Sequence, residues 1–130
     1  MNSESLNSIV REVEKENSVS ALVYHIADPN QWEQAQVSRF YTHPSLHTEG
    51  YIHCSSRNQI EETANFYFAD TDQILVLLID TSKLEADVLY EEATRGGQYP
   101  HIYGPVNISS IVGSRQFKRR GKKFRINLPD

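Results

Sequence analysis

Two short segments of the chain place histidines in extended surroundings, where an imidazole could take part in chemistry. In EGYIHCSS (49–56), strand alternation puts His53 on the opposite face from the chain's single cysteine. In YPHIYGP (99–105), His101 and Tyr103 share a face, and prolines on both sides restrict the backbone. A histidine presented to a cleft can bind ligand hydroxyls or exchange protons near neutral pH. His53 and His101 are therefore candidate catalytic residues, and the structural alternative is that each is hydrogen-bonded within the fold.

A pair of glutamates offers the carboxylate that acid–base chemistry would use. Glu91 and Glu92 end the strand-like run ADVLYEEA (86–93) and alternate faces, so at most one of them enters a given cleft. A carboxylate near His53 could act as a base or hold a sugar hydroxyl. The alternative for each glutamate is a solvated charge at the end of a strand.

The serines after His53 lie where a strand is expected to run into a helix. Ser56 followed by Gln59 fits a capping box, and the free N–H groups of a helix N-terminus suit phosphate. Ser55 and Arg57 are therefore candidate ligand-binding residues, Arg57 through a bidentate phosphate contact. Plain N-capping and a solvated arginine are the structural alternatives.

The cysteine and the loop histidines show no pattern typical of a metal site. Cys54 shares the face of Ile52, so we expect it in the core rather than as a nucleophile. His43 and His47 are four residues apart, a spacing that suits a metal only on a helix, and Pro44 disfavours a helix there. We therefore predict no metal.

The elements that must position these residues mix helices and strands irregularly. A helix is predicted from Asp28, which would cap it ahead of Pro29, and another from Ser56, with a short strand and a loop over 39–50 between them. Strand-like runs cover 20–27, 51–55, 73–81 and 86–93, and two more would form a hairpin around RRGK (119–122). The run 73–81 is nearly all apolar, which is typical of a central strand buried on both faces. Without a regular βαβ alternation, the order predicts an α+β fold with a mostly antiparallel sheet.

The totals fit one domain over 1–130, because 130 residues with 38% hydrophobic and 23% charged side chains suit a single globular core. Residues 1–20 form a predicted amphipathic helical extension, with apolar residues at helical spacing from Leu6 to Val13. The longest apolar run, ILVLLI (74–79), is too short to span a bilayer. With one cysteine and a polar, acidic start, we expect a cytoplasmic protein with no membrane partner.

The charge of the chain is unevenly distributed. The formal net charge is −4, yet residues 115–125, within the predicted C-terminal strand or hairpin 113–130, carry seven basic side chains and no acidic one. Together with Phe117 and Phe124, these cations could contact RNA or a nucleotide. The alternative is a sheet edge that lysine and arginine protect from pairing.

The motifs also carry a family resemblance. YHIADPNQW, PSLHTEGYIHCSSRNQIEETANFYF, ILVLLIDTSKL and YEEATRGGQYPHIYGPV resemble DUF952, a small bacterial family of uncharacterised proteins, over a core of about 23–112. The paired GYIHCS and PHIYGP motifs are fairly specific to it. The family in turn resembles the ADP-ribosyltransferase superfamily, which implies a split β-sheet with NAD bound in a cleft.

That likeness implies a role for each candidate residue. In such enzymes a strand histidine holds ribose, an aromatic residue stacks on nicotinamide, and a glutamate assists transfer. The matching residues here are His53, then Tyr67 or Tyr103, and Glu91 ahead of Glu92; His25 and Ser55 would line the same cleft. His101 has no counterpart in that set. A histidine in this position is similar instead to the sites of the RNA 2′-phosphotransferase branch, which use histidines and arginines. Membership of that branch would give Arg57 and the basic C-terminal segment a role in binding.

The residues leave three functions open. The first is an enzyme that handles NAD or ADP-ribose, an ADP-ribosyltransferase or an RNA 2′-phosphotransferase, with NAD as a candidate substrate and no required cofactor. The second is a non-enzymatic module that binds a nucleotide or small metabolite. The third is a small domain that binds RNA or a protein partner whose identity the sequence does not indicate.

Overall fold

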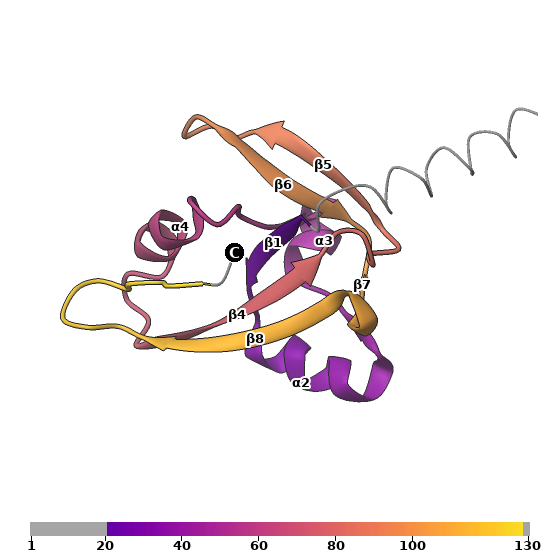
Figure 1. Ribbon diagram of the computed structural model, residues 1–130, viewed down its shortest axis with the longest axis horizontal. Coiled ribbons are helices and arrows are strands. Elements are labelled where there is room, and N and C mark those ends of the chain that lie inside the picture. The colour runs from indigo at the N-terminus through magenta and orange to yellow at the C-terminus, as the bar shows by residue number, and fades with distance from the viewer. Residues whose placement is uncertain (1–20, 129–130) are drawn as a thin grey trace, which may run out of the picture.

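The computed structural model describes residues 21–128, in which strands are interrupted by three α-helices (Figure 1). In chain order the elements are β1 (Leu22–Ile26), α2 (Pro29–Ser38), β2 (Phe40–Tyr41), α3 (Pro44–Thr48), β3 (Ile52–His53), α4 (Ile60–Tyr67), β4 (Gln73–Asp80), β5 (Asp87–Glu92), β6 (Gln98–Tyr103), β7 (Val106–Asn107), a 3₁₀ turn η1 (Ile108–Ser110) and β8 (Ile111–Lys118). The predicted helix over 1–20 lies outside the described residues. Within them, no helix has both the length and the apolar character needed to cross a membrane.

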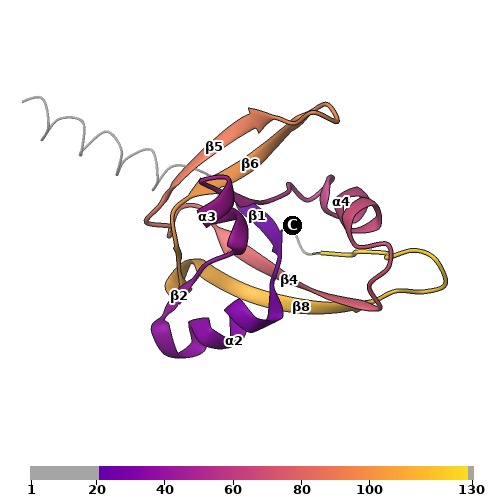
Figure 2. The same ribbon diagram turned by 180° about the vertical axis from the view of Figure 1, so that it is seen from behind.

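The strands pair antiparallel in three small sheets, which confirms an α+β fold with mostly antiparallel sheets. Their orders are β1–β4–β8, β2–β7 and β3–β6–β5. Figure 2 shows β4 between β1 and β8 in the first of these sheets. A bridge between Tyr24 and Ser55, with N–H···O distances of 2.8 and 2.7 Å, joins the first sheet to the third. This bridge places the histidine-bearing strand β3 beside β1.

Strand β4 lies at the centre of the first sheet, as its apolar run predicts. Side chains from its two faces belong to two different clusters of core residues. Leu77 and Ile79 pack on one side, where α2 contributes Ala35. Val76 and Leu78 pack on the other side, against α4 and the C-terminal segment. The alternation of a strand therefore explains why α2 and α4 cover opposite faces of this sheet (Figures 1 and 2).

The segment 39–50 differs from its prediction. Asp28 caps α2 as expected, because its Oδ1 accepts from the Gln31 N–H at 3.1 Å. After β2, however, the expected loop contains the helix α3, which His43 caps through its ring Nδ1, accepting from the Ser45 N–H at 3.1 Å. Pro44 occupies the first turn of this helix, where its missing N–H removes no helical hydrogen bond.

The helix predicted from Ser56 begins four residues later, at Ile60. Half of the capping box is present, since Gln59 Oε1 accepts from the Ser56 N–H at 3.0 Å. Gln59 itself is the residue that precedes the helix, and its side chain makes no capping bond to the helical N–H groups. The capping interaction therefore closes a turn ahead of α4 instead of starting it.

The second strand of the predicted C-terminal hairpin is absent from the described residues. After β8, a single bridge pairs Arg120 with Lys123, and residues 124–128 form no strand. The side chain of Asn65 on α4 replaces a strand partner there, donating to the Phe124 carbonyl at 3.0 Å and accepting from its N–H at 2.7 Å. This contact holds the buried Phe124 ring against α4.

Replacing Asn65 with alanine tests this attachment. We expect Asn65→Ala to lower the free energy of unfolding by about 1–2 kcal/mol, because both backbone groups of Phe124 lose their partner. Urea unfolding measures the change, with the exposed Asn30→Ala on α2 as the matched control. Equal stability of the two variants would contradict the assigned role of Asn65.

Candidate functional site

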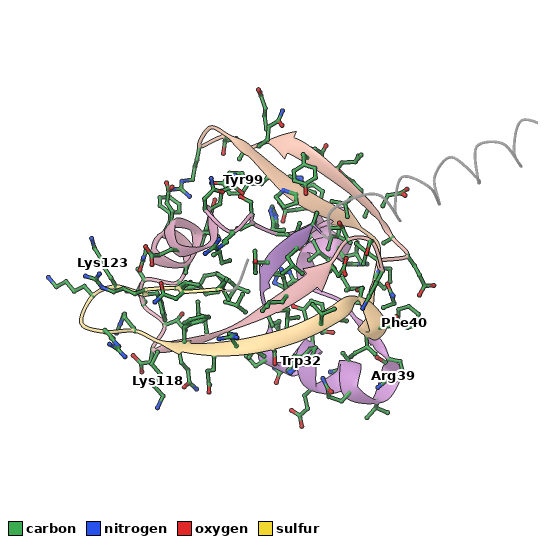
Figure 3. All side chains as sticks on the ribbon, viewed as in Figure 1. Trp32, Arg39, Phe40, Tyr99, Lys118 and Lys123 are labelled. Carbon is green, nitrogen blue, oxygen red and sulfur yellow. The ribbon has the colours of Figure 1, made fainter. Side chains whose placement is uncertain are left out.

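A cavity of about 570 Å³ lies between β3 and β6 on one side and α4 on the other, with the tip of the β5–β6 hairpin over one end. Figure 3 shows Tyr99 on the side of β6 toward α4. Cavities of this size take small-molecule ligands. The lining consists of Tyr24, His25, Ile26, His43, Glu49, Tyr51, His53, Cys54, Ser55, Ile60, Thr63, Tyr67, Phe68, Glu92, Ala93, Thr94, Arg95, Tyr99 and His101.

Strand register brings the two candidate catalytic histidines together. β3 and β6 pair so that His53 lies directly opposite His101. The ring centroids are 5.3 Å apart and the rings meet edge to face. Tyr51, two residues before His53 and on the same face, stacks on the His101 ring at 4.1 Å with an interplanar angle of 14°. Both imidazoles are thus held at one wall of the cavity by a shared aromatic neighbour.

His101 is the more constrained of the two, because a carboxylate lies behind its ring. Its Nδ1 is 2.9 Å from Oε1 of Glu91, and only 6% of the residue is exposed. The Tyr103 hydroxyl donates to the same oxygen. These two hydrogen bonds, that from Tyr103 first, hold the pKa of Glu91 below its ordinary value, and the same contact raises the pKa of Tyr103 to about 12.

The bonding assigns the tautomer of His101. Glu91 is ionised at neutral pH and can only accept, so the proton of a neutral His101 ring is on Nδ1. Within residues 21–128, no other hydrogen bond to this ring is present, which leaves Nε2 for the cavity that His101 lines. A ring nitrogen with a lone pair and a carboxylate behind it can accept a proton from a bound molecule and return it.

His53 also pairs with a carboxylate, but it is more exposed to solvent than His101. Its Nε2 lies 2.9 Å from Oε2 of Glu49, and the two side chains are 50% and 47% exposed. Glu49 reaches it across the turn at Gly50, whose φ of 92° suits glycine. His53 is therefore placed at the mouth of the cavity, where it can contact a ligand.

His25 does not have the binding role expected of it, because both of its ring nitrogens are used inside the protein. Nδ1–H donates to the His53 carbonyl at 2.6 Å, and Nε2 accepts from the Tyr41 hydroxyl at 2.7 Å. That hydroxyl in turn accepts from the Asp28 N–H at 3.0 Å. Burial lowers the pKa of His25 to about 3, so the ring is neutral and links β1, β2 and β3.

Ser55 and Arg57 also differ from their expected roles. Ser55 is buried beside the cavity, and its hydroxyl donates to Thr63 Oγ1 at 3.1 Å. Because the helix starts at Ile60, neither residue lies at a helix N-terminus that could bind phosphate. Arg57 is exposed and does not belong to the cavity lining.

The remaining predicted residues divide between the cavity and the layer behind it. Tyr67 lines the cavity from α4 and is 63% exposed. Glu91 and Tyr103 do not line it, so Glu91 cannot touch a ligand in the way that direct stabilisation of a ribosyl cation requires. Glu92, the less favoured glutamate, does line the cavity. Glu91 acts through His101 instead.

Four contributors to the site were not predicted. Tyr51 and Tyr99 each lie two residues before a candidate histidine, so strand alternation alone could have found them. Glu49 depends on the turn at residue 50, and Arg95 on the fold of the hairpin tip, so no local pattern marks either one.

Cys54 and the loop histidines have structural positions. Cys54 is 4% exposed, and burial raises the pKa of its thiol, which confirms the predicted core position. His43 caps α3 and lines the cavity, and burial lowers the pKa of its ring. Among residues 21–128, no three His, Cys, Asp or Glu side chains are grouped closely enough to hold a metal ion.

Comparisons with known proteins identify a family and a fold. The family model described as protein of unknown function (DUF952) matches residues 26–114. Two crystal structures and a solution structure of protein CC0527 from Caulobacter crescentus share the fold. The crystal structure of CC0527 without substitutions has a TM-score of 0.69 at 24% identity, with 79% of this chain and 91% of that chain covered. The solution structure has a TM-score of 0.67 at 23% identity, with 79% and 90% covered. No curated protein matches the chain.

Proposed function

Since the chain belongs to the DUF952 family, whose description names no activity, we propose from its cavity that it is an enzyme that uses His101 for acid–base catalysis on a small nucleotide-type ligand. The observation that carries this proposal is the Glu91–His101 pair. It holds a buried imidazole by Nδ1 and leaves Nε2 without a protein partner within residues 21–128, in a residue that lines a cavity of about 570 Å³. In His25, by contrast, both ring nitrogens are bonded inside the protein.

The ligand class follows from the rest of the lining. Tyr67, Tyr99 and Phe68 offer aromatic faces for a base, and His53 with Glu49 offers hydrogen bonds for sugar hydroxyls at the mouth. The resemblance to ADP-ribosyltransferases makes NAD and ADP-ribose the first ligands to test. NAD would be a substrate in this reaction, so the enzyme needs no separate cofactor.

The reaction that fits this arrangement is transfer of a ribosyl group. The bond from ribose C1′ to nicotinamide breaks, and its electron pair leaves with nicotinamide, which becomes neutral. A water or hydroxyl oxygen bonds to C1′, and its proton moves to Nε2 of His101. Glu91 stabilises the imidazolium that forms, while His53 positions the ribose.

A binding module without catalysis is the second candidate, and Glu91→Gln separates the two. The glutamine keeps the size of the side chain but cannot stabilise an imidazolium, so we expect turnover of NAD to fall by about 10- to 100-fold. Because Glu91 does not line the cavity, the affinity for ADP-ribose should stay unchanged. Calorimetry gives the affinity and nicotinamide release gives the turnover.

The possible outcomes of this comparison are distinct. Binding without any turnover in the wild-type protein would favour the binding module. Absence of heat with NAD, ADP-ribose and 2′-phosphorylated RNA alike would overturn the enzyme candidate.

An RNA-binding role for residues 115–125 is a separate candidate. In Figure 3, Lys118 at the end of β8 and Lys123 in the turn that follows extend outward, and none of the residues 115–125 lines the main cavity. Arg119 is tied to Asp72 at 3.2 Å, whereas Arg115, Lys118 and Arg120 are exposed. Salt-sensitive RNA binding that reversal of the Arg120 charge removes would support this role.

A further inference from the structure

The charges that line the main cavity are few and uneven. Two carboxylates, Glu49 and Glu92, face one arginine, Arg95, which comes from the tip of the β5–β6 hairpin. Among the described residues of the lining, Arg95 is the only lysine or arginine. An anionic group of a ligand therefore has one permanent cation to bind to in this cavity.

The guanidinium of Arg95 is already held in a fixed position. Its Cζ lies 3.6 Å from the centroid of the Phe66 ring and 5.7 Å from that of Tyr67, so aromatic faces of α4 support it. The Arg95 side chain is only 26% exposed. A planar guanidinium that stacks on a ring keeps its edge free for bidentate contacts with an oxyanion.

The ion pair that this guanidinium forms in the structure is weak. Nη2 of Arg95 lies 3.2 Å from Oε1 of Glu62, whose side chain is 70% exposed. An exposed ion pair of this kind contributes little, because water screens the attraction between its charges. Within residues 21–128, this is the only hydrogen bond from Arg95, so further N–H donors are available. A bound oxyanion can share or displace Glu62 with little loss.

Arg95 and His101 come from different points along the β5–β6 hairpin. Four Cα steps separate Gly97, at the hairpin tip, from His101, and a strand rises about 3.3 Å per residue, which gives roughly 13 Å between these two backbone positions. A second, open cavity of about 450 Å³ also has Arg95 in its lining, so the residue stands where the two cavities meet. The anion site is thus at the far end of the main cavity from His101.

We propose that Arg95 binds one phosphate group of the ligand, at the end of the cavity away from the bond on which His101 acts. The inference rests on the proposed function, because the phosphate belongs to the ligand of that site. With a single cation present, the expected ligand class is a phosphate monoester or one phosphate of a nucleotide. In NAD or ADP-ribose, whose pyrophosphate carries two such groups, Arg95 would hold one of them.

Calorimetry with adenosine, AMP and inorganic phosphate tests the proposal without any need for turnover. We expect the wild-type protein to bind AMP more tightly than adenosine. Arg95→Met should weaken the binding of AMP by about 10- to 100-fold, the range of charge-assisted hydrogen bonds, and leave the affinity for adenosine unchanged. Arg95→Lys keeps the charge without the planar fork, so its loss should be intermediate.

Two further variants complete the design. Arg115→Met removes the same charge from β8, outside both cavities, and should leave AMP binding at the wild-type level. Glu62→Gln removes the competing carboxylate, so AMP and inorganic phosphate should each bind about two- to fivefold more tightly.

The proposal is overturned if AMP binds no better than adenosine, or if Arg95→Met weakens both equally. It is also overturned if Arg115→Met weakens AMP as much as Arg95→Met does. The proposed function fails on a different measurement, the turnover of His101 variants, so either idea can fail while the other stands.

Discussion

Replacing His101 with glutamine should reduce the turnover of NAD by about 10²- to 10⁴-fold, the range expected when a positioned acid–base group is removed. The glutamine keeps a polar side chain next to Glu91, so this carboxylate retains a hydrogen-bond donor. It has no group that titrates, so it cannot take the proton of the attacking oxygen. The affinity for ADP-ribose should change far less than turnover.

A split between turnover and affinity distinguishes loss of catalysis from loss of structure. In His101→Gln the turnover of NAD should fall while the affinity for ADP-ribose changes little, a split that unfolding would not produce. His47→Gln is the matched control, since His47 is exposed on α3 and does not line the cavity. If His101→Gln kept the turnover of His47→Gln, the assigned role of His101 would be wrong.

Strand alternation predicted part of the site but not what supports it. His53 and His101 line the cavity as expected, because side-chain direction in a strand has a period of two, and Cys54 is buried as expected. Tyr103, however, shares a face with His101 and does not line the cavity. The carboxylate behind His101 could not be placed, because it depends on the register between β5 and β6, where Glu91 lies opposite Tyr99. Register is set by pairing across the sheet, which no single segment encodes.

Helix boundaries show a second limit of local patterns. Pro44 was interpreted as a helix breaker, yet proline in the first turn costs no hydrogen bond, and α3 begins at it. The predicted last strand is absent because Asn65, 59 residues before Phe124 in the chain, provides its backbone partners. A side chain that replaces a strand at such separation leaves no periodic signal.

The His25 network makes acid stability a second strong prediction. The pKa of this ring is about 3 in the folded protein, below the ordinary 6.5, because burial disfavours the charged form. Between these two values the unfolded chain binds more protons than the folded one. The stabilisation is therefore complete above about pH 6.5 and declines as the pH falls toward 3. From about pH 7.5 to about pH 4.5, protonation of His25 alone should lower the free energy of unfolding by about 2–3 kcal/mol.

His25→Gln separates this titration from the packing of the side chain. At about pH 7.5 the variant should be less stable by about 1–3 kcal/mol, because glutamine cannot satisfy both the Tyr41 hydroxyl and the His53 carbonyl with the same geometry. The wild-type advantage should shrink toward acid pH, since only the wild-type protein must expel a proton from a buried ring. Urea unfolding across this range measures both curves. His43, whose pKa is also lowered by burial, leaves a smaller slope of the same sign in each protein. If the two curves ran parallel, or if the exposed His47→Gln flattened the wild-type slope equally, His25 would not be the buried neutral link between the three strands.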